Sequence, residues 1–202
     1  MSGTTKATVL YANAFIVGAV LMGFEMLGSR YLFPYFGGGI GTWAALISTV
    51  LVALALGYFV GGGLVDRHPT ARLIGVAVAA AALALGLVPL LADPLMAGIL
   101  EVLGDGPAAV LLAAAALLLV PLALLGTLSP VAVRLLVREA GESGRVAGRI
   151  YGVSTIGNVF GTLFTTFVLI PTIGSRAITL LYALILGAAA LSLWLVTGRR
   201  RP

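Results

Sequence analysis

Long apolar runs alternate with short polar segments along the whole chain. Six of these runs are unbroken and about 20 residues long or more, the length that a helix needs to cross about 30 Å of hydrocarbon. They cover residues 8–30, 41–63, 72–92, 107–131, 149–171 and 176–197. A membrane β-barrel would instead show alternating segments of about 10 residues. The pattern therefore predicts an all-α, polytopic membrane protein in which residues 1–202 form a single six-helix transmembrane domain.

The composition supports this class. Hydrophobic residues make up 60% of the chain and charged residues only 9%, and the mean hydropathy is +1.14. A soluble domain carries about 25% charged residues. Because the chain has no cysteine, disulfides, thiol catalysis and cysteine-ligated metals are excluded, and we expect no metal and no cofactor.

The basic residues indicate the orientation, since cytoplasmic loops of membrane proteins are rich in Lys and Arg. With the N-terminus inside, the cytoplasmic side carries Lys6, Arg67, Arg72, Arg134, Arg138, Arg145, Arg149 and Arg199–Arg201, and the outer side only Arg30 and Arg176. We therefore expect both termini in the cytoplasm, in a prokaryotic inner (plasma) membrane. The positive charge is then an orientation signal that can also attract anionic membrane lipid, and no binding of nucleic acid is expected.

Two segments are expected to form outer loops. Residues 31–40 contain Tyr31, Phe33, Tyr35 and Phe36, which predicts an aromatic belt at the level of the lipid headgroups. Residues 93–106 are expected to form a loop with a short amphipathic surface helix at 94–103.

Six spans divide into two triplets of opposite orientation. Such inverted repeats of three helices occur within each half of major facilitator transporters. Residues 47–50, Ile-Ser-Thr-Val, resemble residues 153–156, Val-Ser-Thr-Ile, at the expected counterpart in the fifth span. We therefore expect two inverted three-helix repeats, arranged as half of a major-facilitator-like bundle.

Glu25 is the acid that no predicted loop contains. An ionisable group at membrane depth costs about 2.5–3.5 kcal/mol on insertion scales, so it faces a partner or a wet cavity. One interpretation is a structural contact with Arg30, with Arg176 or with a hydroxyl of the fifth span. The other is a carboxylate that binds a cation or carries a proton, with Ser29 on the same helix face and Arg30 five residues on.

The fifth span has a polar face. Side chains at three- and four-residue spacing share one side of a helix, and here they are Ser154, Asn158, Gly161, Thr162 and Thr165. Gly157 and Gly161 form a small-xxx-small pair that allows close helix packing. The face is predicted either to pack tightly against a neighbouring helix or to line a polar cavity.

The loop after the second span resembles the signature loop of the major facilitator superfamily. Gly62, Leu64, Asp66 and Arg67 match that pattern, whereas Pro69 stands where the family has a glycine. The resemblance implies that Gly62, Asp66 and Arg67 belong to a conformational loop. The alternative is a short basic loop in which Asp66 caps the third helix.

Three blocks together resemble the transmembrane region of the membrane-fused spermidine synthase-like proteins. They read Phe-Glu-x-x-x-Ser-Arg at 24–30, Gly-Tyr-x-x-Gly-Gly-x-x-x-Asp-Arg at 57–67, and Gly-Arg-x-Tyr-Gly-x-Ser-Thr-x-Gly-Asn-x-x-Gly-Thr at 148–162. In that family a soluble aminopropyltransferase domain follows the membrane helices. The present sequence stops at Pro202 without such a domain, so we expect no enzymatic activity, and either a stand-alone membrane half or an excised domain.

Two functions follow as expectations. The first is a transporter of small solutes, with polyamine-like cations as candidates, that works as a homodimer of half-facilitator units. The residues expected to contact solute, cation or proton are Glu25, Ser29, Arg30, Ser154, Asn158 and Thr162. The second is a non-transporting membrane anchor or scaffold for a soluble synthase-like or other enzyme partner.

Overall fold

The computed structural model describes residues 3–68, 70, 72–137 and 139–197. Within these residues all regular structure is helical, and six helical segments are long and apolar enough to cross a membrane. The elements are α1 (Gly3–Phe36), α2 (Ile40–Arg67), α3 (Arg72–Leu103), α4 (Pro107–Gly126), α5 (Leu128–Leu136), η1 (Ala140–Glu142), α6 (Ser143–Phe164), η2 (Thr165–Leu169), α7 (Ile170–Thr172) and α8 (Ser175–Thr197). The fold thus supports the predicted integral membrane protein.

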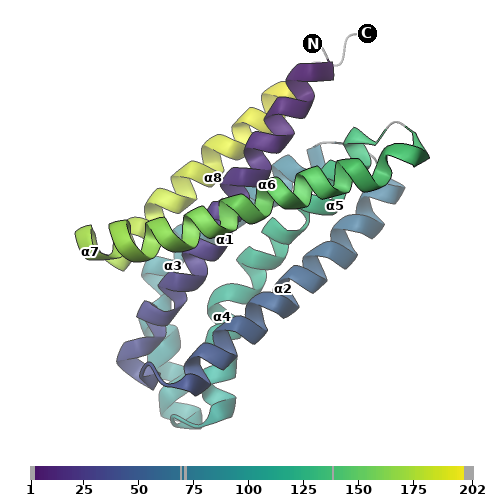
Figure 1. The fold of residues 1–202 in the computed structure, drawn as a ribbon. Helices are drawn as coiled ribbons and strands as arrows, with labels where there is room; N and C mark the ends of the chain where they lie inside the picture. The colour runs from purple at the N-terminus through teal and green to yellow at the C-terminus, as the bar shows by residue number, and fades with distance from the viewer. Residues whose placement is uncertain (1–2, 69, 71, 138, 198–202) are drawn as a thin grey trace.

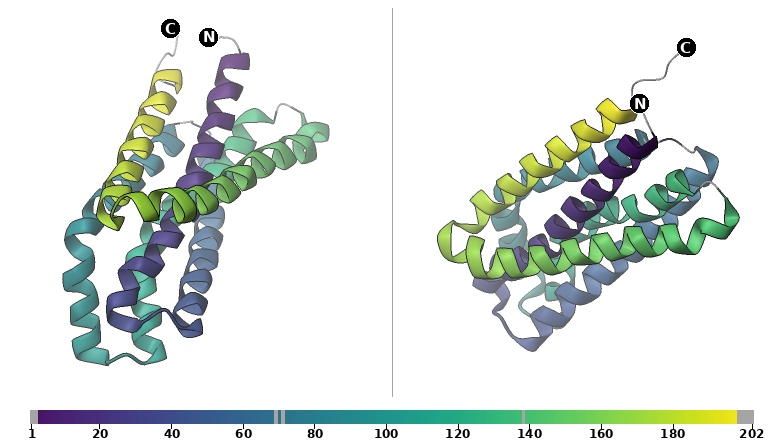
Figure 2. Two further views of the ribbon diagram at one scale, coloured as in Figure 1. Left: turned by 60° about the vertical axis from the view of Figure 1, so that its left-hand side comes forward. Right: turned by 45° about the horizontal axis from the view of Figure 1, so that its top comes forward.

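The helices pack in three main pairs. The most extensive contacts join α1 to α6, α2 to α4, and α3 to α8. Figure 1 shows α6 crossing the face of the bundle over α1, and the start of α1 lies at the same end of the bundle as the end of α8. Figure 2 shows the same placement of the two ends from other sides.

Small residues allow two of these pairs to approach closely. A Cβ atom on Gly157 would lie 2.2 Å from the Phe15 carbonyl oxygen, and one on Gly161 would lie 1.9 Å from that of Ala19. These distances confirm the small-xxx-small contact predicted for the fifth span, and they identify α1 as its partner. In α2, a Cβ on Gly57 would meet the Ala123 carbonyl oxygen of α4 at 2.4 Å.

Two of the long segments contain irregular turns. The fourth span is divided at Thr127, whose Oγ1 donates to the Leu124 carbonyl (2.7 Å). The fifth span changes at Thr165–Leu169 into a π turn, a feature that inserts one residue into a helix and occurs often at functional sites. The π turn lies between α6 and the short α7.

Most residues of the two predicted outer loops belong to long helices instead. Helix α3 continues to Leu103 with Pro89 and Pro94 inside it, so no separate surface helix exists at 94–103. Helix α1 continues to Phe36. Its Tyr31 is buried, and the Tyr31 hydroxyl is hydrogen-bonded to Thr179 Oγ1 of α8 (2.9 Å), because α8 covers this side of α1. Tyr31 is therefore part of the core and not of a headgroup belt.

Candidate functional site

Glu25 lies about two-thirds of the way along α1 and is only 6% exposed. The part of the chain that the structure describes contains three ion pairs, Asp66–Arg134, Glu142–Arg145 and Asp93–Arg176. None of them includes Glu25, and no hydrogen bond to its carboxylate is present among the same residues. Of the three structural partners considered for Glu25, namely Arg30, Arg176 and a hydroxyl of the fifth span, none bonds to it among the described residues, and Arg176 pairs with Asp93.

The residues one turn after Glu25 on α1 show which elements surround that side of the helix. One turn further on, Gly28 packs against Leu46 of α2 and Leu118 of α4. Ser29, four residues after Glu25, lines a cavity and donates from Oγ to the Met26 carbonyl (2.7 Å). Residues four apart share a helix face, so Glu25 and Ser29 lie on the same side of α1, one turn apart.

The cavity, which we call the Arg30 cavity, has a volume of about 290 Å³. Its wall includes Ser29, Arg30 and Phe33 of α1, Trp43 of α2, Thr166 of the π turn and Ile170 of α7. Glu25 is not part of this wall. The structure therefore brings Ser29 and Arg30 into one cavity and leaves Glu25 outside its wall.

The polar residues of α6 make hydrogen bonds within α6 and, at Asn158, to α1. With its nitrogen toward α1, the Asn158 amide donates to the carbonyl oxygens of Gly18 (2.9 Å) and Ser154 (3.2 Å). Thr162 Oγ1 donates to the Asn158 carbonyl (2.9 Å). Gly18 precedes Glu25 by seven residues, about 10 Å along a helix. The contact of Asn158 with Gly18 fits the tight-interface interpretation, and none of Ser154, Asn158 and Thr162 lines the Arg30 cavity.

Two residues of the Arg30 cavity were not expected from the sequence. Thr166 enters its wall from the π turn, whereas the preceding Thr165 is buried and its hydroxyl is hydrogen-bonded to that of Tyr182 in α8. Helical spacing assigned Thr165, and not Thr166, to the polar face of the fifth span. Trp43 resembles an ordinary interfacial tryptophan in sequence, and only the folded arrangement places it opposite Ser29 and Arg30.

The predicted conformational loop lies at the other end of α2. Asp66 pairs with Arg134 of α5 (3.6 Å), and both side chains are more than half exposed. Asp66 thus links α2 to α5, and among the described residues it makes no hydrogen bond to the start of α3. Arg67 is the last residue of α2 and is exposed. A Cβ on Gly62 would have no heavy atom within 4 Å, so this glycine is not required for helix contact.

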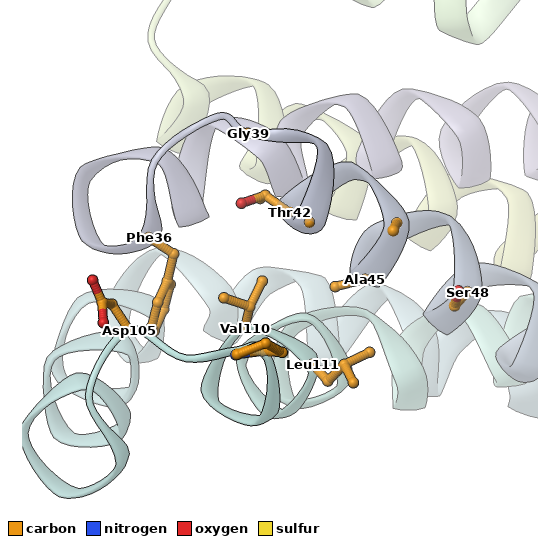
Figure 3. A pocket seen from close by; sticks show the side chains of 11 residues that line it. Phe36, Gly39, Thr42, Ala45, Ser48, Asp105, Val110 and Leu111 are labelled. Atoms are coloured by element: carbon orange, nitrogen blue, oxygen red, sulfur yellow. The ribbon is translucent and has the colours of Figure 1, made fainter.

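A second cavity, of about 410 Å³, lies between the start of α2 and the turn from α3 to α4. Figure 3 shows the Phe36 ring and the Asp105 carboxylate close together at one end and Ser48 at the other. Its remaining wall is mostly apolar. None of the residues predicted to contact a solute, cation or proton lines this cavity.

No family model, no curated protein and no solved structure matches this chain. The resemblance to the membrane-fused spermidine synthase-like proteins therefore remains a hypothesis that rests on its three motifs. The geometry of Glu25 and of the Arg30 cavity carries the functional argument.

Proposed function

We propose that the protein is a membrane transporter of small solutes with a cationic group, working as a homodimer of half-facilitator units. The observation that carries this proposal is Glu25, a 6%-exposed carboxylate on a spanning helix with no ion pair or hydrogen bond among the described residues. A carboxylate in such a place requires a counter-charge. A bound organic cation or a proton supplies that charge during transport.

The pairing of helices supports two inverted repeats. An inverted repeat relates the first, second and third spans to the fourth, fifth and sixth. A contact between the first and fifth spans should then have a counterpart between the fourth and second spans. Both contacts are present as α1–α6 and α2–α4. Both also use glycine pairs spaced by four residues, Gly157 and Gly161 in α6 and Gly57 and Gly61 in α2. This correspondence is what an inverted repeat of the facilitator type requires.

The exposure of α6 supports a second copy. In the span that contains α6, 22% of the most apolar window is buried, compared with 39–50% in the other five spans. A parallel second copy against this face would give the twelve-helix arrangement of a full transporter. We further propose that both termini lie in the cytoplasm, because most of the Lys and Arg residues in the chain then lie on that side.

A flux measurement with a matched acid tests the proposal. Purified protein in liposomes is given radiolabelled spermidine, and wild type is compared with Glu25→Gln and with Glu101→Gln, an exposed acid at the end of α3. Loss of a charge-assisted contact of about 1.5–3 kcal/mol lowers uptake by roughly tenfold or more in the Glu25 variant. Uptake by the Glu101 variant stays at the wild-type rate. Equal uptake in wild type and Glu25→Gln would reject the role of Glu25.

The second candidate function is a membrane anchor for a soluble enzyme. The observation in its favour is that the Asn158 amide and the Ser154 carbonyl are engaged in the contact of α6 with Gly18 of α1, and that Thr162 is hydrogen-bonded within α6. An anchor needs such packing and no solute pathway. Absence of spermidine flux in the wild-type liposomes, together with capture of a synthase-like enzyme by the purified protein, would favour this alternative.

A further inference from the structure

Arg30 differs from the other arginine at its end of the bundle. Tyr31 of α1 is hydrogen-bonded to Thr179 of α8, so the end of α1 and the start of α8 lie together. There Arg176 is paired with Asp93. Arg30 has no ion pair with any residue that the structure describes, and the wall of its cavity contains no acid. Arg30 is exposed, so it presents at this cavity a positive charge that no acid of the described residues neutralises.

The same cavity contains a hydroxyl without a partner. Thr166 Oγ1 is one of two buried side-chain polar atoms, with Asn13 Oδ1, that lack a hydrogen bond among the described residues. A buried hydroxyl without a partner costs about 1–3 kcal/mol. Thr166 belongs to the wall of the cavity, although its Oγ1 is enclosed in the structure. If its side chain rotated toward the cavity, an anionic oxygen there would accept its hydrogen bond beside the Arg30 guanidinium.

The surroundings of the cavity suit a lipid. It lies where α1 ends, α2 begins and α7 follows the π turn, a position at the boundary of the apolar spans. Trp43 and Phe33 are 38% and 62% exposed at its rim, and Ile47 and Phe167 continue an exposed apolar surface away from it. Aromatic residues of this kind gather at the level of lipid headgroups.

We propose that the Arg30 cavity binds the phosphate group of a membrane phospholipid. Arg30 and Thr166 hold the phosphate oxygens, Trp43 and Phe33 flank the glycerol region, and the acyl chains extend over the exposed side chains of α2 and the π turn. The site is distinct from the cation contact proposed at Glu25. It requires neither transport nor a second copy.

The test is lipid retention by the delipidated full-length protein in detergent, measured by native mass spectrometry. The probes are dioleoyl phosphatidylglycerol, dioleoylglycerol, which has the same chains without phosphate, and soluble glycerol 3-phosphate. We expect binding of the phosphatidylglycerol only. Arg30→Gln and Thr166→Val each weaken this binding by about tenfold, the ratio expected for the loss of a hydrogen bond to a charged group.

Two matched controls separate the site from general surface effects. Arg176→Gln removes an arginine at the same end of the bundle, and Thr155→Val removes an exposed hydroxyl that donates to the Tyr151 carbonyl (2.8 Å). Both should bind the lipid as wild type does. Thermal unfolding of every variant in detergent confirms that it is folded, and Arg30→Met, which also removes the charge, serves in place of Arg30→Gln if the latter is not.

Three results would overturn the proposal. Equal lipid binding by wild type, Arg30→Gln and Thr166→Val would show that the cavity does not hold the phosphate. Equal binding of dioleoylglycerol would show that the acyl chains alone determine retention. Binding of glycerol 3-phosphate that depends on Arg30, without binding of the lipid, would assign the cavity to a soluble anion.

Discussion

Glycines of the fifth span serve different purposes at neighbouring positions of one helix. Gly161 faces α1 so closely that a Cβ atom would lie 1.9 Å from the Ala19 carbonyl oxygen, whereas a Cβ on Gly148 would have no heavy atom within 4 Å. The nearest group at Gly161 is backbone, which cannot move aside as a flexible side chain can. Residue 161 therefore sets how closely α6 approaches α1.

Replacing these two glycines by alanine should have opposite effects. Gly161→Ala forces the helices apart, and overpacking of this kind costs about 1–3 kcal/mol. Gly148→Ala is neutral or stabilises by up to about 1 kcal/mol, because alanine favours the helix more than glycine does. The free energy of unfolding of both variants can be measured by denaturant titration in mixed micelles. Unchanged stability of Gly161→Ala would contradict the observed contact.

For individual residues, the sequence predicted those that pack between helices better than those that line the Arg30 cavity. Gly157, Gly161 and Asn158 follow helical spacing, which is a local property, and the structure confirms that they face one neighbour. Thr166 depends on the π turn, which no periodicity of the sequence indicates. The contacts of Glu25 depend on which elements surround α1, and residue spacing alone could not decide between partners.

Whole helices are longer than the apolar runs that predict them. Charged and proline residues suggested that the third helix would end near Pro89, yet α3 continues to Leu103. Its Asp93 is satisfied by Arg176 of α8. Pro89 and Pro94 each remove one backbone donor inside α3, which nevertheless continues to Leu103. The helix ends where Gly104 adopts a positive φ of 69° and its N–H donates to the Leu100 carbonyl (2.9 Å), a glycine C-cap. The hydrophobic pattern therefore locates the span without its boundary.

The number and direction of the spans can be tested with introduced cysteines, because the chain has none of its own. A side chain at Gly39, in the turn before α2, or at Gly141, in η1, would have no heavy atom within 4 Å. The spans formed by α2, α3 and α4–α5 separate the two positions. A membrane-impermeant maleimide applied to intact cells should label Gly39→Cys and not Gly141→Cys.

The labelling tests the orientation and the number of membrane crossings separately. Permeabilised cells serve as the control in which both cysteines should react. Labelling of Gly141→Cys alone would reverse the proposed orientation, with the termini outside. Labelling of both cysteines in intact cells would contradict three membrane crossings between residues 39 and 141.

The whole molecule consists of helix pairs arranged around α1 and α4, with α6 on an open face. The pairs α1–α6 and α2–α4 correspond under exchange of the two triplets, and the span with α6 has the least buried apolar window of the six. Six spans were predictable from hydrophobicity because each run must match the membrane thickness. The open face was not, since the same apolar side chains suit lipid, another helix of the chain or a second copy.

The claim on which the proposed transport depends is that one chain forms half of the working unit. Its most direct test is the particle mass of the purified protein in a lipid nanodisc, corrected for scaffold and lipid. A homodimer predicts a protein mass twice the 20.6 kDa of a single chain. The discs are assembled with a large excess of empty discs, so that two unassociated copies do not share a disc by chance. A protein mass of one chain would contradict the homodimer. It would favour a monomeric membrane anchor in which lipid contacts the open face of α6.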